Sequence, residues 1–322
     1  MAIGYFHETE YYIYNELVNG EVSMLILPDL HYSNLISQER LDWIARKIEE
    51  SNADYVLFCG DSVDSVDDYD EQFYLFMRRV SCFAQGLVSF GSHDYWKYIY
   101  DDKGQSIDGD YYLAEFWDRI NKYVRVLDNA SYEDDKIFVT GFTQSKKYYD
   151  PEEVEVDKDK KEIKGLFHPI PEDENQNKLE LEQLLNKTTI PKDKPSILSA
   201  HAPTYFFTSA IQMLSEPYTL VACGHTHNGS VIPGINEVWR STYGFMTPDR
   251  RLLQKNVRNT LGHSSYKVAV CEPVTMFSKS TRLGKFNPLL PIGFTKVIFT
   301  NNKDYQQDKI ITKRWYSVAK RY

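Results

Sequence analysis

Short apolar runs recur along the chain, and each one is followed closely by glycine, aspartate or histidine. The runs are Val22–Leu27, Tyr55–Cys59, Leu87–Phe90, Ile137–Val139, Ile197–Ala200 and Thr219–Cys223. Short runs of this kind, rich in branched and aromatic residues and closed by turn formers, are typical of buried strands. We expect Phe294–Thr300 to form another strand late in the chain.

Helical patterns lie between these runs. In Ser37–Glu50 the apolar residues recur at helical spacing, and Ser37 is well suited to the N-cap position. Similar patterns predict helices at Glu71–Ala84, Tyr112–Tyr123 and Asn177–Asn186. Because strands and helices alternate along the chain, the sequence predicts a layered α/β sandwich around one or two sheets.

A turn signal separates two apolar stretches near the N-terminus. Asn19 and Gly20 lie between Tyr11–Leu17 and Glu21–Leu27. An Asn-Gly step between apolar segments is a strong signal for a β-hairpin. We therefore expect the first two strands to be antiparallel neighbours in one sheet.

The segment Asp150–Lys164 differs in composition from the rest of the chain. Seven of its fifteen residues are acidic and four are lysine, so it can bury little apolar surface. We expect an exposed loop with a short charged hairpin, within a surface insertion at about residues 145–178. Residues 303–322 are expected to form a basic C-terminal tail. With no internal repeat and no clear linker, residues 1–322 are predicted to form a single domain.

Composition and charge limit the kinds of molecule that the protein is expected to bind. The 322 residues include 46 acidic and 37 basic side chains, which gives a formal net charge of −9. This balance argues against extended nucleic-acid binding, which depends on Lys and Arg, but not against a small phosphate substrate held by metal ions. The four cysteines form no CxxC pair, which favours free buried thiols in a reducing compartment. Without a signal-like segment or a membrane-length apolar stretch, a cytoplasmic protein is expected.

Most of the histidines follow predicted strands. Five of the eight do so, namely His31, His93, His201, His225 and His227. Four aspartates join the same ends, namely Asp29, Asp61, Asp64 and Asp94. Open α/β sheets place ligands at the carboxyl ends of strands, and imidazole with carboxylate suits a borderline divalent metal. Each residue alone is readily explained as a turn or loop residue, whereas the ordered combination is not.

These residues form five motifs in a fixed order. They are Asp29-Leu30-His31, Gly60-Asp61-Ser62-Val63-Asp64, Gly91-Ser92-His93-Asp94, Ser199-Ala200-His201-Ala202 and Gly224-His225-Thr226-His227. The order resembles the calcineurin-like metallophosphoesterase superfamily, whose pattern is DxH, GDxxD, GNH(D/E), His and GHxH. The resemblance covers about residues 20–300. The N-terminal hairpin and Lys285–Thr300 look most similar to a bacterial branch that contains membrane-anchored phosphodiesterases.

The resemblance implies a four-layer α/β/β/α sandwich with two mixed sheets and a dinuclear metal site at the loop end. The implied ligands of the first ion are Asp29, His31, Asp61 and His227. Asp61 would bridge the two ions, and the other ligands of the second ion would be Ser92, His201 and His225. His93 would contact the scissile phosphate, Asp94 would orient His93, and Asp64 would support its loop. Manganese is the favoured metal, with iron, zinc, nickel and magnesium as alternatives.

The function implied by the resemblance is metal-dependent hydrolysis of phosphoester bonds, on either diesters or monoesters. Two cations ~3.5–4 Å apart offset the repulsion between phosphate and hydroxide, and they make hydroxide available at neutral pH. The surrounding loops select the substrate, so its identity stays open. A metal-dependent nuclease is an alternative. Its basic groove would use Arg240, Arg250, Arg251, Lys255 and Arg258.

Ser92 departs from the family pattern, which has asparagine at this position. An asparagine carbonyl reaches further than a serine hydroxyl and is the better oxygen donor for a hard cation. Three interpretations follow: an enzyme with a weakened second site, an enzyme that needs a high Mn²⁺ concentration, or a phosphoesterase fold kept as an interaction subunit. The other predicted ligand positions are all filled, which supports an enzyme.

Overall fold

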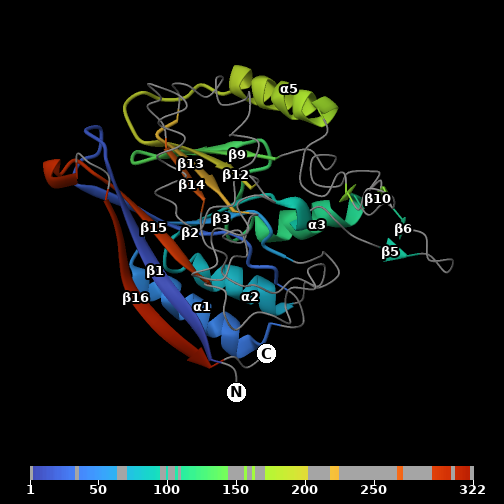
Figure 1. Cartoon of the computed structure of the whole chain (residues 1–322), viewed down its shortest axis with the longest axis horizontal. Helices are drawn as coiled ribbons and strands as arrows, with labels where there is room; N and C mark the ends of the chain where they lie inside the picture. The colour runs from blue at the N-terminus through green and yellow to red at the C-terminus, as the bar shows by residue number, and fades with distance from the viewer. Residues whose placement is uncertain are drawn as a thin grey trace.

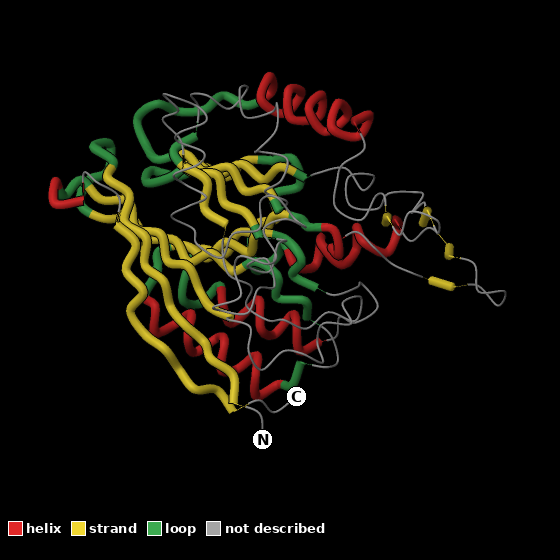
Figure 2. Tube along the Cα trace, viewed as in Figure 1, coloured by secondary structure: helices red, strands yellow, loops and turns green. Residues whose placement is uncertain are grey.

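In the computed structural model the elements stack in four layers (Figures 1 and 2). Helices α1 (Gln38–Ser51), α2 (Glu71–Val80) and α3 (Asp110–Ile120) form one outer layer, and α5 (Pro171–Lys187) forms the other. Two sheets lie between them, which confirms the four-layer α/β/β/α sandwich with two mixed sheets. The structure describes residues 3–32, 36–63, 71–94, 99–100, 106–107, 110–143, 156–157, 162–163, 171–201, 218–224, 267–270, 292–305 and 309–319.

The first sheet has seven strands in the order β16-β1-β15-β2-β3-β4-β7. Their bounds are β1 Ile3–Tyr14, β2 Glu21–Leu27, β3 Tyr55–Cys59, β4 Gln85–Ser89, β7 Arg125–Val126, β15 Ile292–Thr300 and β16 Lys309–Ala319. Strands β2, β3, β4 and β7 pair in parallel, whereas β15 runs antiparallel to β2. The loops after β2, β3 and β4 therefore emerge at the same edge of the sheet.

The second sheet has five strands in the order β14-β13-β12-β9-β8. Their bounds are β8 Ser131–Glu133, β9 Phe138–Phe142, β12 Ser196–Ala200, β13 Leu220–Cys223 and β14 Lys267–Val270. Strands β9, β12, β13 and β14 are parallel, and β8 pairs antiparallel with β9. Together with the first sheet, it confirms a strand at each of the seven predicted positions.

The predicted N-terminal hairpin is wrong. Strand β15 lies between β1 and β2, and it pairs parallel with the former and antiparallel with the latter. The physical reason is burial, because β15 is covered on both faces and such a strand belongs in the middle of a sheet. The Asn19-Gly20 segment instead lies beside the end of β15, where the Asn301 N–H donates to the Gly20 carbonyl oxygen at 3.4 Å.

The helices largely follow the predicted pattern. In α1 the Ser37 side chain caps the first turn by accepting a hydrogen bond from the Arg40 N–H, as predicted. Helix α5 begins at Pro171, earlier than expected and inside the range assigned to the surface insertion. Proline favours the first turn of a helix because its missing N–H has no helical partner there. Sequence periodicity alone did not reveal this first turn.

Two other predicted segments contain regular structure. Within the charged segment, β10 (Val156–Asp157) pairs antiparallel with β11 (Glu162–Ile163), so the expected short hairpin is present. Within the predicted basic tail, a 3-10 turn η7 (Lys303–Tyr305) precedes β16, which pairs along most of β1. Most of that segment is therefore an edge strand rather than a tail. A further short pair joins β5 (Ile99–Tyr100) to β6 (Ser106–Ile107).

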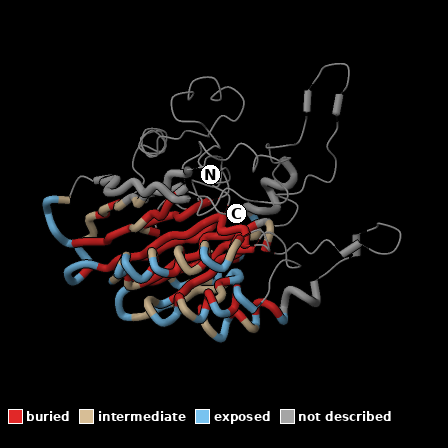
Figure 3. The backbone as a smooth tube through the Cα atoms, turned by 90° about the horizontal axis from the view of Figure 1, so that it is seen from below, coloured by how far each residue is buried: buried red, intermediate tan, exposed pale blue. Residues whose placement is uncertain are grey.

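Two apolar cores hold the layers together. One lies between the first sheet and helices α1 to α3, and the other lies mainly between the two sheets. Figure 3 shows buried strands at the centre and helices that bury only one face. Among the described helices, none combines the length and the apolar character needed to cross a membrane.

Candidate metal centre

The carboxyl ends of strands from both sheets meet at one edge of the sandwich. From the first sheet, Asp29 and His31 follow β2, Asp61 follows β3, and His93 lies in the 3-10 turn η2 (Ser92–Asp94) after β4. His201 follows β12 of the second sheet. These five predicted site residues lie together, although they are scattered over more than half of the sequence. Their roles as ligands or catalysts stay predictions.

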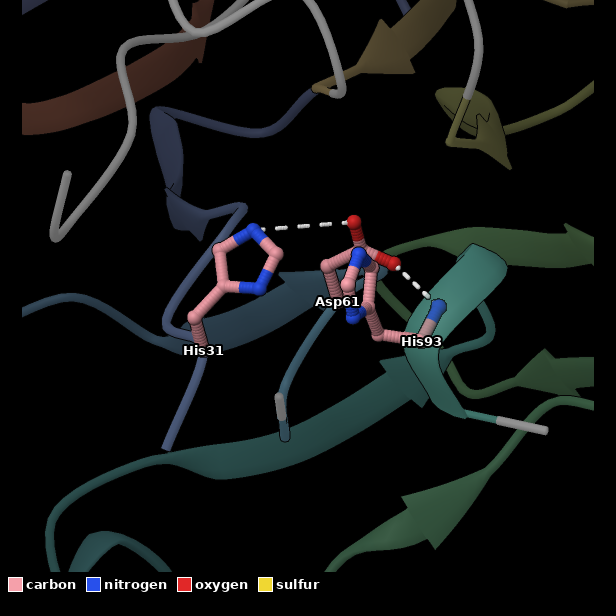
Figure 4. A group of neighbouring side chains, drawn as sticks. All are labelled: His31, Asp61 and His93. Carbon is pink, nitrogen blue, oxygen red and sulfur yellow. Dashed lines mark hydrogen bonds and ion pairs between the residues drawn. The ribbon is translucent and has the colours of Figure 1, made fainter. Parts of the chain in front are cut away.

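Asp61 is central to this cluster. Its Oδ2 lies 3.0 Å from His201 Nε2 and 3.6 Å from His31 Nε2. Asp29 Oδ1 lies 3.8 Å from His201 Nε2 and 3.9 Å from His31 Nε2. Donor atoms within 4.8 Å of one another form two groups, and Asp61 belongs to both. The first group is His31, Asp61 and His93 (Figure 4), and the second is Asp29, Asp61 and His201.

The backbone orients two of these side chains. The Nδ1 of His201 lies 2.9 Å from the Cys59 carbonyl oxygen, so this nitrogen must donate and Nε2 is directed at the carboxylates. The His93 N–H donates to Asp61 Oδ1 at 2.8 Å, as Figure 4 shows. The rings of His31 and His93 meet edge to face, with 4.8 Å between their centroids. These contacts hold the donor atoms toward a common centre.

The loops that carry Asp29, His31 and Asp61 adopt strained backbone conformations. Asp29, His31 and Asp61 have φ values of 56°, 44° and 51°. Left-handed geometry costs a non-glycine residue roughly 1–2 kcal/mol, and such residues cluster at functional sites. Hydrogen bonds between the two loops maintain it, because the His31 N–H donates to the Asp61 carbonyl at 2.9 Å and the Asp29 N–H to the Gly60 carbonyl at 3.0 Å.

Comparison with known proteins agrees with this geometry. A family model of the calcineurin-like phosphoesterases matches residues 22–229, which is more than half of the chain. The chain belongs to the calcineurin-like phosphoesterase family. This confirms the family predicted from the five motifs.

Two curated relatives are similar to this member of the calcineurin-like phosphoesterase family. Two uncharacterized metallophosphoesterases of Helicobacter pylori are similar: one from strain ATCC 700392 / 26695 is 23% identical over 227 residues, and one from strain J99 / ATCC 700824 is 21% identical over 223 residues. Each alignment covers 69% of this chain and 48% of the relative. The chain thus spans about half the length of the curated relatives it matches.

Solved structures with some similarity include two hydrolases. A phosphopantetheinyl hydrolase (PptH) of Mycobacterium tuberculosis has a TM-score of 0.38 and 12% identity, over 65% of this chain and 84% of that one. A dimetal phosphatase of Danio rerio has a TM-score of 0.36 and 11% identity, over 65% of this chain and 83% of that one.

In this member of the calcineurin-like phosphoesterase family, Asp94 anchors the loops around the centre. Its carboxylate accepts hydrogen bonds from the N–H groups of Gly91 at 2.7 Å, Ser62 at 2.9 Å and Val63 at 3.3 Å. Its carbonyl accepts one from Trp117 Nε1 of α3 at 3.1 Å. The contacts place Asp94 as the residue that fixes the loops after β3 and β4. Asp94 would then orient His93, as predicted, by holding the backbone of the turn that carries it.

The charged side chains inside the centre shift one another's pKa values. Burial opposes ionisation of Asp61, yet the neighbouring His201 and His93 hold the pKa of this carboxyl well below its usual range. Burial would lower the pKa of His201, but Asp61 and Asp29 raise it to about 9. Burial and the adjacent Asp61 raise the pKa of Asp94 to about 7. A divalent ion would therefore compete with a proton for His201 Nε2.

The donor set fits a divalent ion. Carboxylate and imidazole atoms from Asp29, Asp61 and His201 face one another while all three side chains are buried. Burying these charges is costly unless they are paired or coordinate a metal. The other ring nitrogen of His201, Nδ1, is hydrogen-bonded to the Cys59 carbonyl oxygen. A metal-bound histidine usually makes such a hydrogen bond with the nitrogen that does not bind the metal.

Several predicted site residues lie outside the described part of the chain. These are His225, His227 and Asp64, together with the five basic residues of the alternative nuclease groove. For Ser92 the backbone is described, as the first residue of η2, but not the side chain. The structure therefore leaves the predicted roles of these residues as they were.

The sequence reasoning missed two residues that organise the site. The Cys59 carbonyl orients His201, and the Trp117 indole fixes the turn that carries His93. A backbone carbonyl has no signature in the sequence. Trp117 lies in a predicted helix, but nothing in the helical pattern indicates that its N–H reaches a loop from another motif.

Proposed function

We propose that the chain is a metal-dependent hydrolase of phosphoester bonds that holds two divalent ions at this centre. The observation that supports it best is that Asp61 faces two imidazoles at once, with its Oδ2 3.0 Å from His201 Nε2 and 3.6 Å from His31 Nε2. A carboxylate placed between two such donors is what a bridged pair of cations requires. Family membership supports the same reaction class.

Asp29, His31, Asp61 and His201 would contribute ligands from the described residues. Asp29 Oδ1 is almost equidistant from His201 Nε2 and His31 Nε2, so either ion could use this carboxylate. The remaining ligands proposed from the motifs are Ser92, His225 and His227. When bound, two such ions would offset the negative charge of the phosphate and lower the pKa of water. Manganese is our proposal for the native metal.

His93 is proposed to act on the substrate. It is partly exposed, whereas Asp29, His31, Asp61, Asp94 and His201 are buried, so its imidazole is the one that substrate can reach most readily among these described site residues. Its backbone is held by Asp61, and its neighbour Asp94 is anchored by three N–H groups. The imidazole can therefore stabilise charge on the phosphate or protonate the leaving oxygen. General acid catalysis of this kind contributes about 10²–10⁴-fold to the rate.

The test uses the purified full chain, freed of metal with a chelator and then titrated with Mn²⁺. Turnover is followed on bis-p-nitrophenyl phosphate and on p-nitrophenyl phosphate, which distinguishes diesterase from monoesterase activity. We expect Mn²⁺-dependent hydrolysis that falls by about 10²–10⁴-fold in His93→Ala with the metals still bound. Asp61→Asn is expected to lose metal binding and nearly all activity.

Two outcomes would contradict the proposal. If the wild-type chain binds Mn²⁺ but turns over neither substrate faster than His93→Ala, the interaction-subunit interpretation is favoured instead. If it binds no Mn²⁺, the centre is not a metal site. Ser92→Asn adds a separate check, because an amide oxygen at this position is expected to raise affinity at one of the two sites. An unchanged titration would show that Ser92 is not a ligand.

A further inference from the structure

Directly beneath the metal centre, the two sheets meet through small polar side chains rather than apolar ones. Cys59 of β3 and Ser89 of β4 come from the first sheet, and Ser199 of β12 comes from the second. All three are fully buried. A buried hydroxyl is costly unless it is hydrogen-bonded, and these groups lie close enough to bond one another across the gap. The Ser89 hydroxyl also lies 3.5 Å from the Phe58 carbonyl oxygen of its own sheet.

The three side chains form a continuous chain of hydrogen bonds. The oxygens of Ser89 and Ser199 lie 2.6 Å apart, and the Ser199 hydroxyl can donate to the Cys59 sulfur at 3.3 Å. The thiol in turn lies 3.2 Å from the carbonyl oxygen of Ala222 in β13. With each group donating once, the direction is Ser89 to Ser199, Ser199 to Cys59, and Cys59 to Ala222. The chain thus crosses between the sheets three times.

This chain is linked to the metal centre through His201. Ser199 and His201 are two positions apart at the end of β12, so they point to the same face. Cys59 holds both residues, because its sulfur accepts from Ser199 and its carbonyl accepts from His201 Nδ1. Among the described members of the two donor groups, His201 alone comes from the second sheet. Its approach to Asp61 therefore depends on how the sheets are aligned at this point.

We propose that Ser199 is a positioning residue for metal binding, because its hydroxyl aligns the two sheets where His201 meets Asp61. Apolar contacts resist separation of the sheets but have no preferred direction, whereas hydrogen bonds require defined distances and angles. Removing the hydroxyl is expected to let His201 shift relative to the first-sheet carboxylates. The inference rests on the proposed function, since it requires that His201 bind an ion.

The experiment measures Mn²⁺ affinity by isothermal titration of the metal-free full chain, together with the free energy of unfolding in urea. Ser199→Ala is expected to bind Mn²⁺ about 10–100-fold more weakly, as for other residues that orient a metal ligand. Ser199→Thr keeps the hydroxyl and should recover most of the affinity. The matched control is Thr140→Val, which removes a buried hydroxyl from β9 of the same sheet, paired with Ser131 at 3.0 Å. It should lower stability but leave Mn²⁺ affinity unchanged.

The proposal is overturned if Ser199→Ala binds Mn²⁺ as tightly as the wild type, or if Thr140→Val loses as much affinity. Should Ser199→Ala not fold, Ser89→Ala replaces it, because this variant removes only the first donor and leaves the Ser199 to Cys59 bond in place. A smaller loss of affinity then supports the proposal, and no loss refutes it. If the wild-type chain binds no Mn²⁺, the proposed function fails along with the inference.

Discussion

Gly60 allows a test of how closely the two sheets approach at the metal centre. Its φ is +81°, and a Cβ at this position would lie 2.4 Å from His201 Nδ1 and 2.6 Å from Cγ of the same ring. The ring cannot swing aside easily, because it is fully buried and donates to the Cys59 carbonyl. We therefore expect Gly60→Ala to displace the imidazole from Asp61.

The structure supplies a matched control at Gly20. Its φ of +89° is similar, but nothing lies within 4 Å of the added Cβ. Gly20→Ala is therefore destabilised only by its left-handed backbone, by roughly 1–2 kcal/mol. Gly60→Ala pays the same strain plus overpacking of about 1–3 kcal/mol, which gives a total of about 2–5 kcal/mol. The difference between the two variants isolates the steric effect on His201.

The assay combines urea unfolding of the metal-free proteins with Mn²⁺ titration and turnover of bis-p-nitrophenyl phosphate. Gly20→Ala should keep wild-type affinity and activity. Gly60→Ala should bind Mn²⁺ about 10–100-fold more weakly, since the orientation of one ligand is lost. Equal destabilisation in the two variants, or wild-type Mn²⁺ affinity in Gly60→Ala, would refute the reasoning that His201 and the loop after β3 are in direct steric contact.

Two further predictions concern carboxylates with several donors. At pH 8, Asp94→Asn is expected to lower the free energy of unfolding by about 2–4 kcal/mol. The reason is that the amide N–H of asparagine would face the Gly91 N–H, which leaves a buried donor without an acceptor. A loss under about 1 kcal/mol in urea unfolding would argue against the anchoring role. Partial burial opposes ionisation of Asp134, but hydrogen bonds from Tyr55 and two backbone N–H groups keep its pKa below the usual value. A lowered pKa adds stability above about pH 4 that is lost on acidification. The difference in free energy of unfolding between wild type and Asp134→Asn should therefore narrow below about pH 4. A difference that stays constant with pH in unfolding curves would contradict this.

The parts of the fold that follow local rules could be predicted from the sequence. Apolar runs closed by turn residues gave the strands, and Ser37 gave the start of α1, because each pattern depends on neighbours in the chain. The approach of Asp29 to Asp61 could also be predicted, since parallel strands bring their carboxyl ends to one edge of a sheet. His201 follows a strand of the second sheet, and only the resemblance to the family placed it beside them.

The remaining features depend on contacts distant in sequence. The Asn19-Gly20 signal favoured a local hairpin, but the late strand β15, which is buried along almost its full length, occupies that position in the sheet. The polar contact between Ser89 and Ser199 joins residues 110 positions apart. Small polar residues within apolar runs look the same in a sequence whether they face another sheet or a helix.

The position of β15 has a consequence for how the protein is made. Strand β2 is complete early in synthesis, yet its partner on one side emerges from the ribosome more than 250 residues later. Until then an apolar strand has an open edge, and such edges recruit other chains. The region matched by the family model stops before β15, so a protein trimmed to that region should aggregate rather than fold.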